Sequence, residues 1–323
     1  MNNLISIDKL LANDRRTLAK AITLVESSRV EDERIAQELL EKVLPHSGKS
    51  IRVGITGVPG VGKSTFIESF GTYLISKGHK VAVLAIDPSS PISGGAILGD
   101  KTRMEKLSQM DQAFIRPSPS SGFLGGVAQK TRESILLFEA AGYDFILVET
   151  VGVGQSEYEV ADMVDFFIVL MLPNAGDELQ GIKKGILELA DLILVNKADG
   201  DYKNKAIQSM AQYQSAVDLM KHSPFWKTQV KICSALEGFN IETTYLTILD
   251  FIKLANDHQE FEKKRLSQSV GWYKKLTTEL INLKLVNNTN LKNLNLELIT
   301  KVKEGKALPL IAAREYVESI FKK

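Results

Sequence analysis

The fold is decided by the stretch Gly57-Val58-Pro59-Gly60-Val61-Gly62-Lys63-Ser64-Thr65. It fits the pattern G-x-x-x-x-G-K-[ST], in which backbone N–H groups surround the phosphates of a nucleotide. Glycine permits that close approach because it has no Cβ atom. Lys63 is expected to reach the β- and γ-phosphates, and the Ser64 hydroxyl to ligate Mg²⁺. A structural turn has no need of the Lys-Ser-Thr ending, so the stretch predicts a phosphate-binding loop (P-loop).

Short apolar runs alternate with amphipathic stretches from Ile51 to about Ala235. Runs rich in Val, Ile, Leu and Phe are typical of parallel strands that helices cover on both faces. The alternation therefore predicts an α/β fold with a doubly wound, mostly parallel sheet, whose functional groups gather at the carboxyl edge. The expected strands are Ile51–Thr56, Val81–Asp87, Ala113–Arg116, Phe145–Thr150, Phe166–Leu172, Leu192–Asn196 and Val230–Ser234.

Both ends of the chain read as helical, which divides it into an N-terminal arm (residues 1–48), a nucleotide-binding domain (49–255) and a C-terminal extension (256–323). In the arm, Asn13-Asp14 can cap one helix, and Ser28-x-x-Glu31 fits a capping box that opens a second. Further helices are expected over Asn240–Leu266, Val270–Leu285, Leu291–Lys303 and Pro309–Phe321.

A second motif, Asn196-Lys197-Ala198-Asp199, follows a strand and indicates which base is bound. In the pattern N-K-x-D, the Asp carboxylate accepts two hydrogen bonds from guanine, and adenine does not offer that pair of donors. Ser234-Ala235-Leu236 resembles a segment that supports guanine O6 through a backbone N–H. The alternative is an ordinary polar turn, but the order of the motifs after the P-loop favours a guanine site.

Three carboxylates are candidates for holding Mg²⁺ directly or through water: Asp87 and Glu149, which lie at strand ends, and Asp100. Glu149-Thr-Val-Gly152 stands where D-x-x-G is usual, so the Gly152 N–H is expected to meet the γ-phosphate. Val153 occupies the place of the water-orienting Gln of common small GTPases, and Gln155, two residues further, is an alternative for that role. Any one of these Asp residues could instead be a helix cap.

The composition excludes several classes of protein. A net charge of +1 over 323 residues gives no basic excess for general nucleic-acid binding. The single cysteine, Cys233, permits neither an intramolecular disulfide nor a Cys-based zinc site and is expected to be a buried small hydrophobe. No signal peptide and no apolar run of about 20 residues are present, so a cytoplasmic protein without a membrane partner is expected.

Taken together, these motifs resemble the MeaB/ArgK/MMAA family, which belongs to the metallochaperone branch of the SIMIBI-class P-loop GTPases. The similarity covers nearly the whole chain and is weakest in its last ~70 residues. It is carried by Gly57–Thr65, Ile86–Ser90, Gly94–Met104, Arg116–Gly126, Glu149–Glu157, Gly176–Lys183 and the arm segments Asp14–Arg16 and Ala19–Ser27.

The resemblance implies a homodimeric GTPase that binds an adenosylcobalamin-dependent acyl-CoA mutase, chiefly methylmalonyl-CoA mutase, and gates loading, protection or reactivation of the cofactor. Pro173–Asp177 resembles the family's third switch, and Lys183 just after it is expected to contact nucleotide across an interface. The expected catalytic residues are Lys63, Asp100, Glu149 and Lys183, and the expected metal ligands are Ser64, Asp87, Asp100 and Glu149. The expected contacts to GTP or GDP are Gly57–Thr65, Gly152, Asn196, Lys197, Asp199, Ser234, Ala235 and Leu236.

Two other functions remain open at this stage. One is an ATP-dependent kinase or transport ATPase, a label attached to relatives, although Asn196–Asp199 disfavours adenine and no phosphoacceptor motif is evident. The other is a GTPase that inserts metal into another enzyme, which usually carries His-rich or Cys-x-x-Cys tracts. Four scattered histidines and one cysteine do not supply such a tract.

Overall fold

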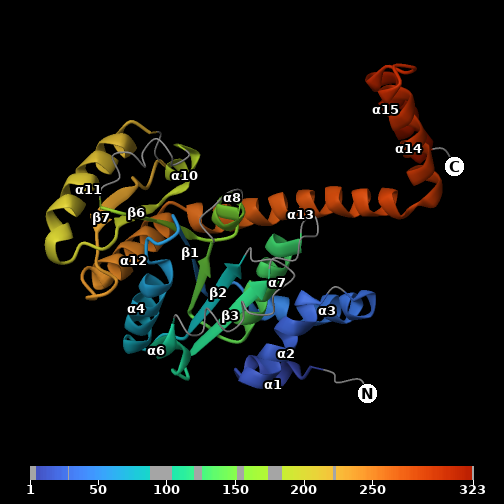
Figure 1. Cartoon of the computed structure of the whole chain (residues 1–323). Coiled ribbons are helices and arrows are strands. Elements are labelled where there is room, and N and C mark those ends of the chain that lie inside the picture. Colours follow the sequence, from blue (N-terminus) through green and yellow to red (C-terminus); the bar gives the residue numbers. More distant parts are fainter. Residues whose placement is uncertain are drawn as a thin grey trace. The chain divides into compact units, whose positions relative to one another are not determined.

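A parallel sheet forms the centre of the computed structural model, which describes residues 5–27, 29–87, 104–119, 126–150, 156–173, 184–220 and 223–321. The sheet has seven strands in the order β3-β2-β4-β1-β5-β6-β7, and every pairing is parallel (Figure 1). All seven predicted strands are present. Their bounds are β1 Ile51–Gly57, β2 Val81–Asp87, β3 Ala113–Pro119, β4 Phe145–Glu149, β5 Phe166–Met171, β6 Leu192–Val195 and β7 Gln229–Ile232.

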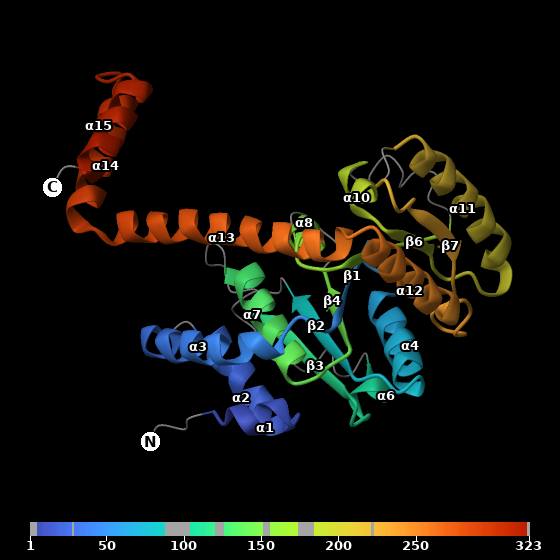
Figure 2. The same ribbon diagram turned by 180° about the vertical axis from the view of Figure 1, so that it is seen from behind.

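Helices cover both faces of the sheet, as Figures 1 and 2 show from opposite sides. On one face, Val53 and Ile55 of β1 share a buried cluster with Phe66 of α4. On the other, Ile146 of β4 lies in a cluster with Phe138 of α7. The prediction of a doubly wound sheet is therefore confirmed. The helices that precede α12 are α1 Ile7–Leu11, α2 Arg15–Glu26, α3 Val30–Val43, α4 Lys63–Ser76, α6 Glu105–Ser108, α7 Gly126–Ala140, α8 Ser156–Ala161, α10 Lys184–Leu189 and α11 Lys203–Asp218, with short 3₁₀ helices η1 Leu44–His46 and η2 Gly200–Tyr202.

The N-terminal arm begins its helices partly as predicted. Asp14 caps α2, because its carboxylate accepts a hydrogen bond from the Thr17 N–H at 2.8 Å. The capping box at Ser28 was wrong: α3 has Arg29 at its N-cap, with no side-chain cap. The Ser27 hydroxyl instead makes the side-chain hydrogen bonds just before α3. It accepts from the Arg29 N–H at 3.3 Å and donates to the Asp32 carboxylate at 2.6 Å.

The helical C-terminal region departs from the prediction of one helix over Asn240–Leu266. The chain instead forms α12 (Ile241–Asp257) and α13 (Glu260–Asn287). Gln259 lies between them in the left-handed region at φ 59°, which a continuing helix does not allow. The helices α14 (Thr289–Lys303) and α15 (Pro309–Phe321) follow. Asn288 caps α14 through its side chain. The gap expected between the helices Val270–Leu285 and Leu291–Lys303 is therefore reduced to this one residue between α13 and α14.

The chain separates into two compact units, Met1–Arg265 and Leu266–Lys323. Within the second unit, Leu298 and Ala312 are buried. Many large apolar side chains of that unit are exposed: Leu266, Tyr273, Leu280, Ile281, Val286, Leu296, Leu308, Leu310, Ile311, Val317 and Phe321. Among the described helices, none has the length and apolar character needed to span a bilayer.

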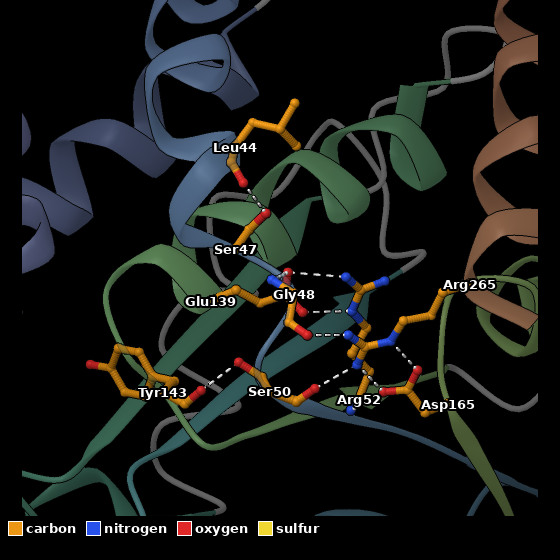
Figure 3. Close-up of polar contacts among 9 residues, drawn as sticks. All are labelled: Leu44, Ser47, Gly48, Ser50, Arg52, Glu139, Tyr143, Asp165 and Arg265. Carbon is orange, nitrogen blue, oxygen red and sulfur yellow. Dashed lines mark hydrogen bonds and ion pairs between the residues drawn. The ribbon is translucent and has the colours of Figure 1, made fainter. Parts of the chain in front are cut away.

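A network of charged and backbone groups closes the amino edge of the sheet (Figure 3). Arg52 of β1 makes a bidentate pair with Glu139 at 2.8 and 3.0 Å. Arg265 of α13 makes another with Asp165, at 2.8 and 2.6 Å, and also donates to the carbonyl oxygens of Gly48 and Ser50. The start of α13 is thereby fixed to the linker that leads into the P-loop strand. We call this set the amino-edge network.

Candidate nucleotide-binding site

The P-loop leaves β1 and enters α4, so the predicted strand–loop–helix context is present. Gly57, Gly60 and Gly62 have φ values of 152°, 80° and 95°, which side chains rarely adopt. A Cβ at Gly57 would lie 2.5 Å from the Leu170 carbonyl oxygen, and one at Gly62 would lie 2.9 Å from Asn196 Nδ2. Glycine at these two positions is thus required by the neighbouring chain as well as by the backbone conformation.

Lys63 is the first residue of α4 and folds back over the loop. Its Nζ donates to the Gly57 carbonyl oxygen at 2.8 Å and to the Val58 carbonyl oxygen at 3.4 Å. Burial lowers the pKa of the Lys63 ammonium, and the carboxylates of Glu149 and Glu157 oppose that shift. The ammonium is therefore held against the backbone of the loop, at the N-terminus of α4, where a helix favours an anion.

Two of the predicted metal ligands meet at the carboxyl edge of the sheet. Ser64 Oγ donates to Glu149 Oε1 at 3.3 Å, although these residues are 85 positions apart. Ser64 lies in the first turn of α4, and Glu149 is the last residue of β4. Glu149 is only 9 % exposed. The pair places one hydroxyl and one carboxylate beside the P-loop.

Asn196 joins three segments of the site from the end of β6. Its Nδ2 donates to the Val61 carbonyl oxygen at 2.9 Å. Its Oδ1 accepts from the Ala235 N–H at 3.0 Å and from Cys233 Sγ at 3.5 Å. One buried amide therefore links the P-loop to the chain after β7. Cys233 is fully buried, and burial raises the pKa of its thiol to about 12.

A cavity of about 550 Å³ opens beside this amide. Lys197 is exposed, with its backbone in the left-handed region at φ 60°, and Asp199 is half-buried. The two predicted guanine motifs follow different strands, and residues of both line this one cavity. The sequence of either motif alone does not show that they lie together. The lining comprises Gly62, Thr65, Asn196, Lys197, Asp199, Gly200, Asp201, Tyr202, Ser234, Ala235, Leu236 and Glu237.

Several predicted site residues lie outside the described residues: Asp100, Gly152 and Lys183, with most of the third-switch segment. Asp87 ends β2, but its side chain is not described. Within the described ranges, no group of three or more His, Cys, Asp or Glu side chains could hold a metal ion. Sequence reasoning missed Glu157 as a site residue, although it closes the quoted segment Glu149–Glu157. Its burial could not be foreseen from a polar helix start.

Comparisons with known proteins agree with this geometry. A protein-family model described as "Methylmalonyl Co-A mutase-associated GTPase MeaB" matches residues 18–290. The chain is 46 % identical to the GTPase ArgK of Escherichia coli (strain K12), over 98 % of this chain and 96 % of that protein. It is 48 % identical to a mitochondrial methylmalonic aciduria type A homolog of Mus musculus, over 84 % of this chain and 68 % of that protein.

Solved structures give the same answer for the fold. The crystal structure of an LAO/AO transport system kinase is 40 % identical, with a TM-score of 0.80, over 98 % of this chain and 96 % of the other. The match of the family model over most of the chain and the identities of the relatives show one family. The chain belongs to the MeaB family of P-loop GTPases, which includes ArgK and the methylmalonic aciduria type A proteins.

Proposed function

We propose that this GTPase is a metallochaperone that binds an adenosylcobalamin-dependent acyl-CoA mutase, namely methylmalonyl-CoA mutase, and gates loading, protection or reactivation of its cofactor. The observation that carries the proposal is the family match over residues 18–290, whose description names a mutase-associated GTPase. The nucleotide would act as the signal and the mutase as the client. Cytoplasmic location stays a prediction.

GTP selectivity would come from Asp199 at the cavity beside Asn196. A carboxylate there can accept both donors of the guanine edge, and adenine would leave it unsatisfied. Lys197 would lie along the base, and the Ser234–Leu236 backbone would meet guanine O6. The phosphates would lie on the Gly57–Thr65 amides, with Lys63 moving from carbonyl oxygens to phosphate oxygens.

The residues present fit a magnesium ion. Mg²⁺ takes few protein oxygens and keeps waters, so a hydroxyl and a carboxylate such as Ser64 and Glu149 suffice without a larger cluster. When bound, the ion would neutralise phosphate charge in the transition state. Asp87 and Asp100 stay predictions as further ligands.

Hydrolysis would proceed by in-line attack of water on the γ-phosphate, with Lys63 and the P-loop amides stabilising charge on the transferring group. Asp100 and Lys183 stay predictions as further catalytic groups. Because Val153 replaces the usual Gln, we expect a slow basal rate that the mutase stimulates.

The partner surfaces are proposed from the C-terminal unit and the third-switch segment. The unit from Leu266 to Lys323 exposes many large apolar side chains, which supports a homodimer built on it. Lys183 would report the nucleotide state across an interface. A kinase remains the second candidate, since a similar structure carries that name; it requires phosphate transfer to an acceptor other than water.

The test is to measure GTP hydrolysis by the purified chain alone and with an adenosylcobalamin-dependent methylmalonyl-CoA mutase, and to ask whether the two proteins co-elute. We expect a slow basal rate, stimulation by the mutase and a nucleotide-dependent complex. A fast rate that the mutase leaves unchanged, together with no co-elution, would refute the chaperone role. Addition of isobutyryl-CoA mutase in parallel shows which mutase is the client.

A further inference from the structure

Glu157 is a buried carboxylate that the site as described so far does not use. It lies in the first turn of α8 and is 1 % exposed. Its Oε2 accepts no hydrogen bond from any residue that the structure describes. Burying a carboxylate oxygen without a hydrogen-bond donor is costly, so such groups persist mainly where function requires them.

The position of Glu157 follows from the packing of α8 on β1. A Cβ at Gly54 of β1 would lie 3.0 Å from Val160 Cγ1, 3.0 Å from Val164 Cγ2 and 2.6 Å from Phe167 Cδ2. Glycine at this point lets the apolar side chains lie directly on the strand. Glu157 precedes Val160 by three residues, so both lie on one face of the helix. The carboxylate is therefore held against the strand that carries the P-loop.

The first turn of α8, which carries Glu157, begins only seven residues after β4 ends at Glu149, so it lies at the carboxyl edge of the sheet, on the nucleotide side. The charge of Glu157 acts on the Lys63 ammonium, as does that of Glu149. Lys63 itself donates to the Gly57 and Val58 carbonyl oxygens. Glu157 thus lies near the lysine that is expected to meet the terminal phosphates, and its Oε2 has no hydrogen-bond donor among the described residues.

The chemistry of the nucleotide restricts what Glu157 can bind. A triphosphate presents only acceptor oxygens, and a carboxylate is repelled by them. Beside a bound triphosphate, the partner of this carboxylate must therefore be a hydrogen-bond donor. Water is the small donor that hydrolysis consumes, and the usual water-orienting Gln is replaced by Val153 in this chain.

We infer that Glu157 is a further catalytic residue, which orients the attacking water by accepting a hydrogen bond from it. The water oxygen bonds to the γ-phosphorus, and the bond from that phosphorus to the β–γ bridging oxygen breaks, leaving its electron pair on GDP. Both water hydrogens leave on the inorganic phosphate, so Glu157 ends unchanged. The inference rests on the GTP hydrolysis described under the proposed function.

The test compares Glu157→Gln with the matched variant Glu159→Gln, which makes the same change on the same short helix. Glu159 is only half-buried, and its charge acts on Arg132 rather than on Lys63. Single-turnover hydrolysis of preloaded GTP, affinities for GTP and GDP, and the melting temperature of the nucleotide-free protein are measured for both. Glu157→Asp, one methylene shorter, tests rescue by a carboxylate.

We expect Glu157→Gln to slow hydrolysis about 100-fold, the scale of one positioned acid–base group, with GTP and GDP affinities within about threefold. Its nucleotide-free melting temperature should not fall, because a neutral amide replaces a buried charge. Glu159→Gln should hydrolyse GTP at the wild-type rate, and Glu157→Asp should be intermediate.

Three outcomes would overturn the inference. A Glu157→Gln rate within twofold of wild type would show that no water depends on this carboxylate. A joint loss of GTP affinity, GDP affinity and melting temperature would make the residue structural. A higher Mg²⁺ requirement for GDP binding would assign it to a metal-bound water instead. If the wild type itself does not hydrolyse GTP, the proposed function fails first.

Discussion

The buried carboxylates at the two edges of the parallel sheet differ in the groups that lie next to them. At the amino edge, Glu139 and Asp165 each meet an arginine in bidentate geometry (Figure 3). At the carboxyl edge, Glu149 and Glu157 act on Lys63, whose ammonium is bonded to carbonyl oxygens. Charges at the amino edge are matched inside the chain, which fixes the fold. Those at the carboxyl edge are arranged for a ligand, which is where an α/β sheet binds one.

If this contrast is right, changes at the carboxyl edge should alter nucleotide binding and leave stability intact. The largest effect is expected for Asp199→Asn, which removes the negative charge that accepts both guanine donors and puts an NH₂ donor in place of one of the two acceptor oxygens. Two hydrogen bonds to a charged group are worth about 4 kcal/mol together, so GTP affinity should fall about 1000-fold. Calorimetric titration with GTP measures it. Asp257→Asn, an exposed change at the end of α12 that does not line the cavity, is the control, and an equal loss there would remove the specific role of Asp199.

At the amino edge, we expect substitutions to lower stability and to leave nucleotide binding unchanged. Arg265→Ala leaves Asp165 buried at 1 % exposure without its guanidinium. Breaking a buried pair in this way costs about 3 kcal/mol, which urea unfolding would show as a lower midpoint. Nucleotide affinity of the folded protein should not change. Lys263→Ala, in an exposed pair on the same helix, should cost less than about 1 kcal/mol. Equal losses of unfolding free energy in the two variants would refute the claim that the buried Arg265–Asp165 pair stabilises the fold.

Lys63→Ala should weaken GTP binding while leaving the stability of the nucleotide-free protein almost unchanged. Truncating a buried charged partner of the phosphates should weaken GTP binding about 100-fold. The melting temperature without nucleotide should stay within a few degrees of wild type, because burial already disfavours this charge. Fluorescent GTP analogues and a thermal scan measure both quantities. Retained tight binding would mean that Lys63 does not reach the phosphates.

The smallest effect concerns Cys233 behind Asn196. Since burial raises the pKa of its thiol to about 12, the folded protein should react with a thiol reagent at pH 8 far more slowly than the protein unfolded in guanidinium. Cys233→Ala removes only a weak contact at 3.5 Å, so GTP affinity should fall less than about threefold. Rapid labelling of the native protein would show that the segment behind the guanine cavity opens.

Local patterns predicted the parts of the molecule that local chemistry specifies. The seven strands, the P-loop and the N-K-x-D motif each carry their own signal in a short segment. The sequence also allowed Ser64 and Glu149 to be grouped, because strand ends meet at one edge. The three-part division at residues 48 and 255 stays a prediction, and the boundary between the two compact units falls after Arg265 in the sequence.

Other features depend on contacts that no local pattern encodes. Arg265 and Asp165 are 100 positions apart, so their pairing could not be read from either segment. The break between α12 and α13 rests on Gln259, a residue with no marked preference for the left-handed conformation. Glu157 looks like an ordinary acidic residue at a helix start, and its burial depends on how α8 packs in the folded chain.

The central claim is that the carboxyl edge forms a guanine-selective GTP site. Parallel calorimetric titrations of the nucleotide-free protein with GTP and ATP, both with Mg²⁺, test it most directly. The account predicts saturable binding of GTP and binding of ATP that is at least about 1000-fold weaker, since adenine leaves the Asp199 carboxylate unsatisfied. Comparable affinities for the two nucleotides would contradict it.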